Sequence, residues 1–263
     1  MLTTLLSILL AVPLAAQGRV VHVDGTNISG TITDASVDQI EIQVGDTART
    51  ISPGEVLRLS FGSEPALVQQ AKGFMAKLEF QNAVNLLTEA EGITDPAWVP
   101  PYTKLLKAEA FLAWSSFDKG RAEDSNRAFS EWLAAYPDHF WNARARMGQA
   151  TALGRTGKVQ DAAKMMQDLA GFAFDKNLGK QVELHARLTR CEVYLDGNEP
   201  TLARQRLEGQ NGLIASLKTA SSSPESSSAL RNALRVHWIK SQILLGDAIE
   251  MTDGLSQAKS YWE

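Results

Sequence analysis

A small residue followed four positions later by a large apolar one recurs along residues 63–263. Because two residues four positions apart lie on one face of a helix, each pair predicts a helix that approaches a neighbour closely at the small residue and fills the adjacent groove with the large one. The pairs are Ala83 with Leu87, Ala128 with Trp132, Ala162 with Met166, Ala203 with Leu207, and Ala258 with Trp262. Their recurrence predicts about five stacked pairs of helices.

A second set of small residues lies twelve positions before three of these alanines, on the preceding apolar segment, and comprises Ala71, Ala150 and Cys191. Small residues at matching positions of two antiparallel helices allow close contact, so we expect this set to pack inside the helical pairs. Cys191 is the only cysteine of the chain. A thiol in a small position packs like a slightly large alanine, which favours packing over reactivity.

These patterns resemble the tetratricopeptide repeat, a helix-turn-helix unit of about 34 residues with small residues at matching positions of both helices. Ala128 and Ala162 are separated by this repeat length, and ATALGRTGKVQDAA, residues 150–163, is similar to the turn region of that family. The other intervals between the paired alanines are longer, so those units would carry insertions, and a looser α-solenoid is the alternative. The resemblance implies a non-enzymatic scaffold whose inner helices present a concave surface to a peptide or protein partner.

Residues 17–62 alternate apolar and polar side chains, with turn signals at Asp24-Gly25 and Gly45-Asp46. This pattern predicts a small β domain of about five short antiparallel strands. The order of its signals, with DGTNISGTI after an apolar strand and VLRLSF at the end, resembles the small Sm-like or SH3-like barrels. Three arginines against six acidic residues give this segment a net charge of −3, the wrong sign for binding phosphates, so we expect no nucleic-acid partner.

Residues 1–16, MLTTLLSILLAVPLAA, contain an apolar run that ends in a pair of small residues. This order is typical of a secretory signal peptide cleaved after Ala16, and the run is shorter than the roughly 20 residues that span a bilayer. An uncleaved membrane anchor or a buried apolar N-terminus is the alternative. Because no lipoprotein-type cysteine follows the run, we expect a periplasmic or secreted protein of a bacterial envelope.

The helical domain is predicted to span residues 63–263, because FGSEPALVQQA marks the change from a period of two to a helical period. Within it, TASSSPESSS, residues 219–228, is the one low-complexity stretch. Such a sequence is too polar to bury, so it predicts a loop between the fourth and fifth helical pairs.

Motifs for catalysis or metal binding are weak. The four histidines, His22, His139, His185 and His237, are far apart in the sequence, so they form no local metal motif. Two Ser-x-x-Lys sequences, at 116–119 and 256–259, lack the accompanying S-D-N and K-T-G elements of serine acyl-transfer enzymes. We therefore expect no enzymatic activity, no cofactor and no metal.

Aromatic residues gather between Trp98 and Trp141, where ten of the nineteen in the chain lie. Most are expected in the core, but Trp98, Trp114 and Trp141 could instead form an exposed face that contacts a peptide or a glycan. A carbohydrate-binding or carbohydrate-processing envelope protein is therefore the alternative function. At the end of the chain, Tyr261 and Trp262 have no following helix to cover them, which predicts a docking edge for a second copy or another partner.

Overall fold

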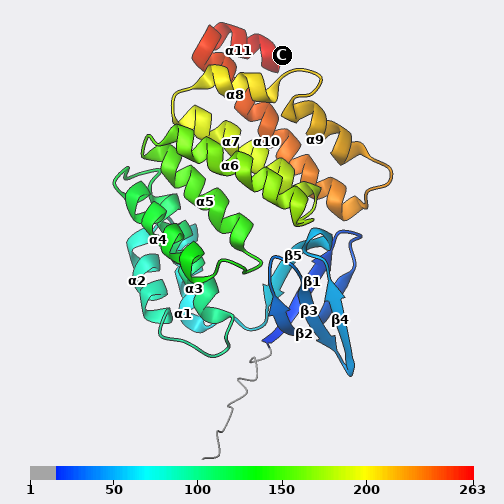
Figure 1. The fold of residues 1–263 in the computed structure, drawn as a ribbon. Helices are drawn as coiled ribbons and strands as arrows, with labels where there is room; N and C mark the ends of the chain where they lie inside the picture. The colour runs from blue at the N-terminus through cyan, green and yellow to red at the C-terminus, as the bar shows by residue number, and fades with distance from the viewer. Residues whose placement is uncertain (1–15) are drawn as a thin grey trace, which may run out of the picture.

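The computed structural model describes residues 16–263, as a sheet followed by a curved array of helices (Figure 1). The segment expected to be a signal peptide lies outside the described residues, apart from Ala16 at the start of the first strand. The change from strands to helices falls between Phe61 and Ala66. The fold class predicted from the sequence is confirmed.

The N-terminal part is one antiparallel sheet, with the strand order β4-β3-β2-β1-β5. Gly25 and Gly45 have positive φ angles of 92° and 58° in two of its turns, a conformation that glycine adopts without strain. Strand β5 returns beside β1, so β4 and β5 form the two edges. The resemblance to Sm-like or SH3-like barrels stays a prediction. The strands are β1 (Ala16–His22), β2 (Asn27–Ala35), β3 (Ile40–Val44), β4 (Thr47–Ile51) and β5 (Val56–Phe61).

The helical part begins with four consecutive pairs, α1/α2, α3/α4, α5/α6 and α7/α8, and continues with α9, α10 and α11. Each pair packs on the next, and the buried apolar side chains form successive clusters along the array. The helices are α1 (Ala66–Ala76), α2 (Phe80–Ala90), α3 (Val99–Trp114), α4 (Arg121–Ala135), α5 (Asn142–Arg155), α6 (Val159–Asp175), α7 (Lys180–Asp196), α8 (Pro200–Leu207), α9 (Leu213–Ser222), α10 (Ser228–Asp253) and α11 (Leu255–Trp262).

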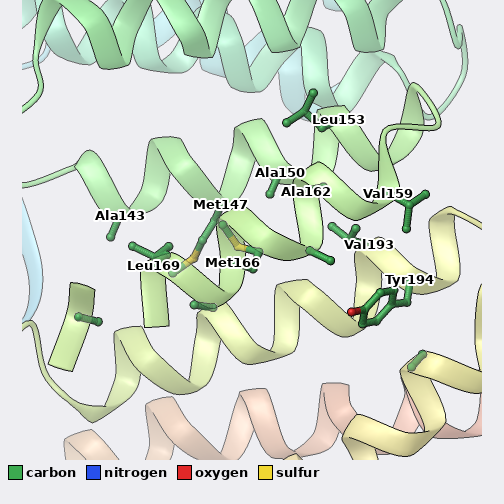
Figure 2. Close-up of a cluster of buried hydrophobic side chains, with 14 of the residues drawn as sticks. Ala143, Met147, Ala150, Leu153, Val159, Ala162, Met166, Leu169, Val193 and Tyr194 are labelled. Atoms are coloured by element: carbon green, nitrogen blue, oxygen red, sulfur yellow. The ribbon is translucent and has the colours of Figure 1, made fainter. Parts of the chain in front are cut away.

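Small residues lie at the contacts between paired helices, as Figure 2 shows for α5 and α6. Ala150 and Ala162 are fully buried there, and the Met166 side chain fills the space beside them. Close contact at the alanines and filling by the methionine together give this pair a dense core. The other small or groove-filling positions that are buried are Ala71, Ala83, Leu87, Trp132, Cys191, Ala203, Leu207 and Ala258.

The second pair differs from the prediction by about one helical turn. Ala128 is only partly buried, whereas Ser125 is fully buried and its hydroxyl donates a hydrogen bond to the Ala108 carbonyl oxygen at 3.0 Å. The close contact therefore lies at Ser125, with the buried Phe129 four positions later, and the prediction for Ala128 is wrong. A serine fits this position because it is small and its hydroxyl is satisfied by the facing backbone.

The repeat length also differs from the spacing of Ala128 and Ala162. The second helices of the four pairs begin at Phe80, Arg121, Val159 and Pro200. All three intervals between these starts are longer than the roughly 34 residues typical of the tetratricopeptide repeat. The shorter spacing of the two alanines arises because they occupy different positions in their helices.

The serine-rich segment forms a shorter loop than its composition predicts. Helix α9 continues to Ser222 and α10 begins at Ser228, which leaves only residues 223–227 outside the helices. Ser227 caps α10, because its Oγ accepts a hydrogen bond from the Leu230 N–H at 3.1 Å. The prediction of a loop over all of 219–228 is therefore wrong at its start.

Candidate binding cleft

Loops of the helical array hold the β sheet on the inner side of the curve (Figure 1). The α4–α5 loop continues the hydrogen bonding of the sheet, since Val37 N–H donates to the Asp138 carbonyl oxygen and Phe140 N–H donates to the Ala35 carbonyl oxygen. Further along, the Ser227 hydroxyl before α10 donates to the Val23 carbonyl oxygen. The sheet is therefore attached to both halves of the array.

The α6–α7 loop makes the closest approach to the sheet. A Cβ atom on Gly54 would lie 2.3 Å from the Asn177 carbonyl oxygen, so no larger residue fits at Gly54 without moving this loop. Lys176 Nζ lies 2.9 Å from Asp38 Oδ1, and Gln181 Nε2 donates to the Val56 carbonyl oxygen at 2.7 Å. The sheet thus occupies part of the surface that a concave-face partner would use.

The aromatic residues form a junction between sheet and helices. Phe61, the last residue of β5, stacks on Trp98 with ring centroids 5.1 Å apart and meets Trp141 edge-on at 5.5 Å. Tyr102 contacts both tryptophans. Trp98 and Trp141 are buried, so the prediction that they could form an exposed aromatic face is wrong. Trp141 nevertheless contributes to the lining of a neighbouring cleft.

The remaining predicted contact residues lie far from this junction. Trp114 is partly buried and packs under Arg121, whose guanidinium carbon is 4.1 Å from the indole centroid. Tyr261 is partly buried and donates a hydrogen bond to Gln242 Oε1, whereas Trp262 is 54% exposed. The structure does not bring these three residues into one site.

A cleft of about 570 Å³ lies between β5 and the first helices of the pairs. One wall is residues 53–59, and the other comes from α3, α5, α7 and α10. Concave sites with mostly apolar walls and a few polar groups are the usual form of binding sites. The apolar lining includes Leu57, Leu112, Met147, Leu178 and Val182.

Charged residues at the cleft are largely paired. Arg144 donates from Nε and Nη2 to the two carboxylate oxygens of Glu109, at 2.6 and 2.7 Å, and so joins α5 to α3. Burial opposes the charge of Arg144, but attraction and hydrogen bonding from Glu109 outweigh it and raise the pKa of Arg144. Glu192 pairs with Lys240. Arg58 is exposed and forms no ion pair with any residue of 16–263, so of the two arginines that line the cleft it is the one without an acidic partner there.

Two histidines meet at the far wall of the cleft. The rings of His185 on α7 and His237 on α10 have centroids 4.4 Å apart. Burial, with smaller contributions from His237 and Lys240, lowers the pKa of His185 to about 3. Burial and Lys240 also lower the pKa of His237. Both rings are therefore neutral at pH 7 and add hydrogen-bonding groups to the cleft rather than charge.

The outer edge of β5 lies along this cleft. Gly62 N–H donates to the Gln17 carbonyl oxygen, and Val20 lies opposite Leu59 in the register. In an antiparallel ladder, hydrogen-bonded pairs alternate with non-hydrogen-bonded pairs. Because Gln17 and Gly62 form a hydrogen-bonded pair, Val20 and Leu59, three positions along, form a non-hydrogen-bonded pair. The N–H and C=O of Leu59 therefore point away from β1. Within residues 16–263 no hydrogen-bond partner meets them there. The edge of β5 is thus a free backbone donor and acceptor beside an apolar wall.

Groups suited to covalent or metal chemistry do not gather at this site. Burial, and to a smaller extent Glu192, raises the pKa of the Cys191 thiol to about 12, so it is protonated at pH 7. The Ser-x-x-Lys residues at 116–119 and 256–259 do not line the cleft. Among residues 16–263, no group of three or more His, Cys, Asp or Glu side chains is placed to hold a metal ion.

Comparison with known proteins adds little to this geometry. No family model matches the chain, and no curated protein matches it. Among solved structures, the chain is similar to a crystal structure of nearly identical TPR-like repeats assigned to a kinesin light chain of Podosopora anserina, with 14% identity and a TM-score of 0.49 over 75% of this chain and 90% of that one. The fold assignment rests instead on the helical pairs and their contacts. Within 16–263, none of the helices has the length and apolar character needed to cross a membrane.

Proposed function

We propose that the chain is a non-enzymatic scaffold that binds an extended segment of a protein partner in the cleft, where the segment pairs as a strand with the outer edge of β5. The observation that carries this proposal is the unpaired backbone of Leu59 beside an apolar wall. A partner strand can supply both a donor and an acceptor to these groups, and each such hydrogen bond is worth about 0.5–1.5 kcal/mol net. Addition of a strand to a sheet edge is a recurrent mode of peptide recognition.

The walls of the cleft define the chemistry of the segment. A strand rises about 3.3 Å per residue and directs alternate side chains to opposite sides. Side chains on one side would face the apolar wall around Met147 and Val182, and therefore would be apolar themselves. An acidic side chain near Arg58 would pair with the one cation of the cleft that is free of an ion pair within residues 16–263. The expected ligand is a short apolar segment with one acidic residue.

Selection from a random peptide library displayed on phage tests this proposal, followed by fluorescence anisotropy with the selected peptides. Leu57 is partly buried and lines the cleft, so Leu57→Lys should weaken binding about tenfold or more by placing a charge against the apolar ligand. Leu78→Lys is the matched control, because Leu78 is 59% exposed and lies outside the cleft. Equal affinities for both variants, each with the circular dichroism of the wild type, would contradict the proposal.

The charge preference provides a second test at the same site. Arg58→Glu keeps an exposed side chain at this position but reverses its charge. Repeating the selection with this variant should replace the acidic residue of the selected peptides by a basic one. Selected sequences with the same charge pattern for both proteins would show that the ligand does not pass Arg58.

We also propose that the protein acts in the bacterial cell envelope after export and cleavage behind Ala16. The support is the order of apolar and small residues in 1–16. A binding site for short extended segments suits a scaffold that holds a partner's terminal or linker region, because such regions lack structure that would have to be broken on binding.

A further inference from the structure

A second pocket lies where α7, α8 and the α8–α9 loop meet, and its volume is about 440 Å³. The residues of α7 that border it, Arg187 and Arg190, are on the side of the helix opposite His185 and Glu192, which line the cleft. The pocket and the cleft have no lining residue in common. The pocket is therefore separate from the proposed peptide site.

Three arginines gather at this pocket. Arg187 and Arg190 are about one turn apart on α7, and Arg206 comes from α8. Burial, and then Glu192, raises the pKa of the Cys191 thiol to about 12, and all three arginines oppose that rise, so their guanidinium groups lie near the same point. Like charges that share a helix face repel each other. An anion bound between them would relieve this repulsion.

The two arginines of α7 have only weak or neutral partners. Arg187 Nη1 is 3.7 Å from Glu183 Oε1, whereas Lys180 Nζ lies 2.7 Å from the other oxygen of that carboxylate. Arg190 Nε donates a hydrogen bond to the uncharged Tyr194 hydroxyl at 3.2 Å. Both guanidinium groups therefore keep donors for a ligand.

The charge of the pocket is not balanced by its other lining residues. The Arg206 side chain is exposed and forms no ion pair or hydrogen bond with any residue of 16–263. Glu208 also borders the pocket, but Arg204 Nε holds its carboxylate at 3.0 Å. Three arginines against one glutamate leave a net charge of +2 on the lining residues, although the whole chain has a net charge of −4. The pocket is thus a positive site on an acidic protein.

The α8–α9 loop adds uncharged polar groups to the same pocket. Its shape is fixed by a hydrogen bond from the Gly212 N–H to the Gly209 carbonyl oxygen at 3.0 Å, and Gly209 has a φ angle of 87°. The carboxamides of Gln210 and Asn211 border the pocket from this loop, and that of Gln205 borders it from α8. Carboxamides donate and accept hydrogen bonds, which suits the hydroxyl groups of a ligand.

We propose that this pocket binds a small sugar phosphate, with the phosphate among the three arginines and the sugar hydroxyls against the carboxamides. Planar guanidinium groups pair with two phosphate oxygens at once. A phosphomonoester carries a charge of about −1.5 to −2 at pH 7 and has three strong acceptor oxygens, which match the excess charge and the number of arginines. A single carboxylate would leave part of that charge unmatched. The volume is within the range of about 300–1,000 Å³ that small-molecule sites have.

Titration of the full chain with glucose 6-phosphate, fructose 6-phosphate and ribose 5-phosphate, followed by NMR of the backbone amides, tests this proposal. At least one of the three should bind with a dissociation constant below about 1 mM and shift the amide signals of Gly209 and Gly212. Inorganic phosphate should bind more weakly, and glucose should not bind detectably, because each supplies only one part of the ligand. Succinate, which carries its two charges on carboxylates, should also bind more weakly.

Arg206→Gln should raise the dissociation constant of the best sugar phosphate about tenfold or more, because it removes one charge-assisted contact and breaks no side-chain contact within residues 16–263. Arg235→Gln is the matched control. It removes the same charge from an exposed arginine of α10 that borders neither the pocket nor the cleft, so the dissociation constant should not change. Both variants should bind the peptides selected on the cleft as the wild type does, which tests the two sites separately.

Three results would overturn the proposal. One is the absence of binding by all three sugar phosphates at about 10 mM. Another is succinate binding as tightly as the best sugar phosphate. The third is a dissociation constant that Arg206→Gln raises no more than Arg235→Gln does, with the wild-type circular dichroism in both variants.

Discussion

Gly148 on α5 shows how one absent side chain sets the distance between two helices. A Cβ atom at this position would lie 2.2 Å from Cζ of Phe129, whose ring is fully buried in α4. The glycine therefore allows the second and third helical pairs to approach closely.

Gly148→Ala should lower the free energy of unfolding by about 1–3 kcal/mol, because overpacking against Phe129 outweighs the better helix propensity of alanine. Gly171→Ala is the matched change in α6, where nothing lies within 4 Å of the added Cβ, and it should raise stability by up to about 1 kcal/mol. Urea denaturation measures both. Shifts of the same sign in the two variants would contradict this account of the helix contact.

The lowered pKa values of the histidines at the cleft imply that the stability of the protein depends on pH. The pKa of His185 is about 3 in the folded protein and about 6.5 in an unfolded chain, so the unfolded state binds protons more readily between these values. Stability should therefore be full above about pH 6.5 and fall as pH drops towards 3, by at most about 1.4 kcal/mol per pH unit for this residue. In His185→Gln, thermal melts at pH 7 and pH 4.5 should differ less than in the wild type. An undiminished difference would mean that other groups control acid unfolding.

The sequence predicts the burial of a residue where the spacing pattern lies within a single helix. Ala162 and Met166 are such a case, because four-residue spacing within one helix fixes their common face. Arg144 and Glu109 were missed because they are 35 residues apart on different helices, so no local spacing relates them. The same holds for His185 and His237, whose separation in the sequence had suggested that each stands alone.

At the scale of the elements, one aromatic side chain joins β5 to the helices in addition to polar contacts such as that of Gln181 with Val56. Phe61 lies between Trp98 and Trp141 and belongs to the cores of both the sheet and the helices. Removing its ring would leave a gap at this junction and separate two packed surfaces. The position of β5, and with it the cleft, should therefore depend on Phe61.

Phe61→Ala should lower the free energy of unfolding by about 2 kcal/mol and change the fluorescence of the neighbouring tryptophans. Peptides selected on the wild type should bind this variant more weakly, since the wall formed by β5 loses its anchor. Phe174→Ala, which removes a ring that is 80% exposed, should change neither property by a measurable amount. Similar denaturation midpoints for the wild type and Phe61→Ala would show that the junction is not held by this ring.

The sequence predicted the type of most elements but not how the sheet sits on the helices. Alternation and turn residues predicted the strands, and recurring small residues predicted the paired helices. Helix α9 was missed because its serine-rich end has the composition of a loop. The position of the sheet on the helices depends on contacts such as Lys176 with Asp38 and Gln181 with Val56. These contacts join residues 138 and 125 positions apart, so no local sequence pattern relates them.

At the scale of the whole molecule, the proposed export predicts the mass of the mature protein. Expressed with its own N-terminus in a bacterial host with an outer membrane, the protein should be found in the periplasm and begin at Gln17. Intact mass spectrometry measures this start directly. A full-length mass together with retention in the membrane fraction would support the uncleaved anchor instead.

The sheet and the helical array form the cleft together, so a bound segment should contact residues of both. A strand added to β5 should protect the Leu59 amide from exchange, while side chains of α5 and α7 line the opposite wall. The opposite edge of the sheet, β4, lies away from the cleft and provides an internal reference in the same experiment.

Hydrogen exchange at single amides, measured with and without a saturating selected peptide, tests the proposed binding mode most directly. The account predicts that exchange at the Leu59 amide slows by about tenfold or more, while the amides of β4 exchange as before. Unchanged exchange at Leu59 in a saturated complex, with protection confined to other surfaces of the helical array, would contradict the central claim that partners bind along the edge of β5.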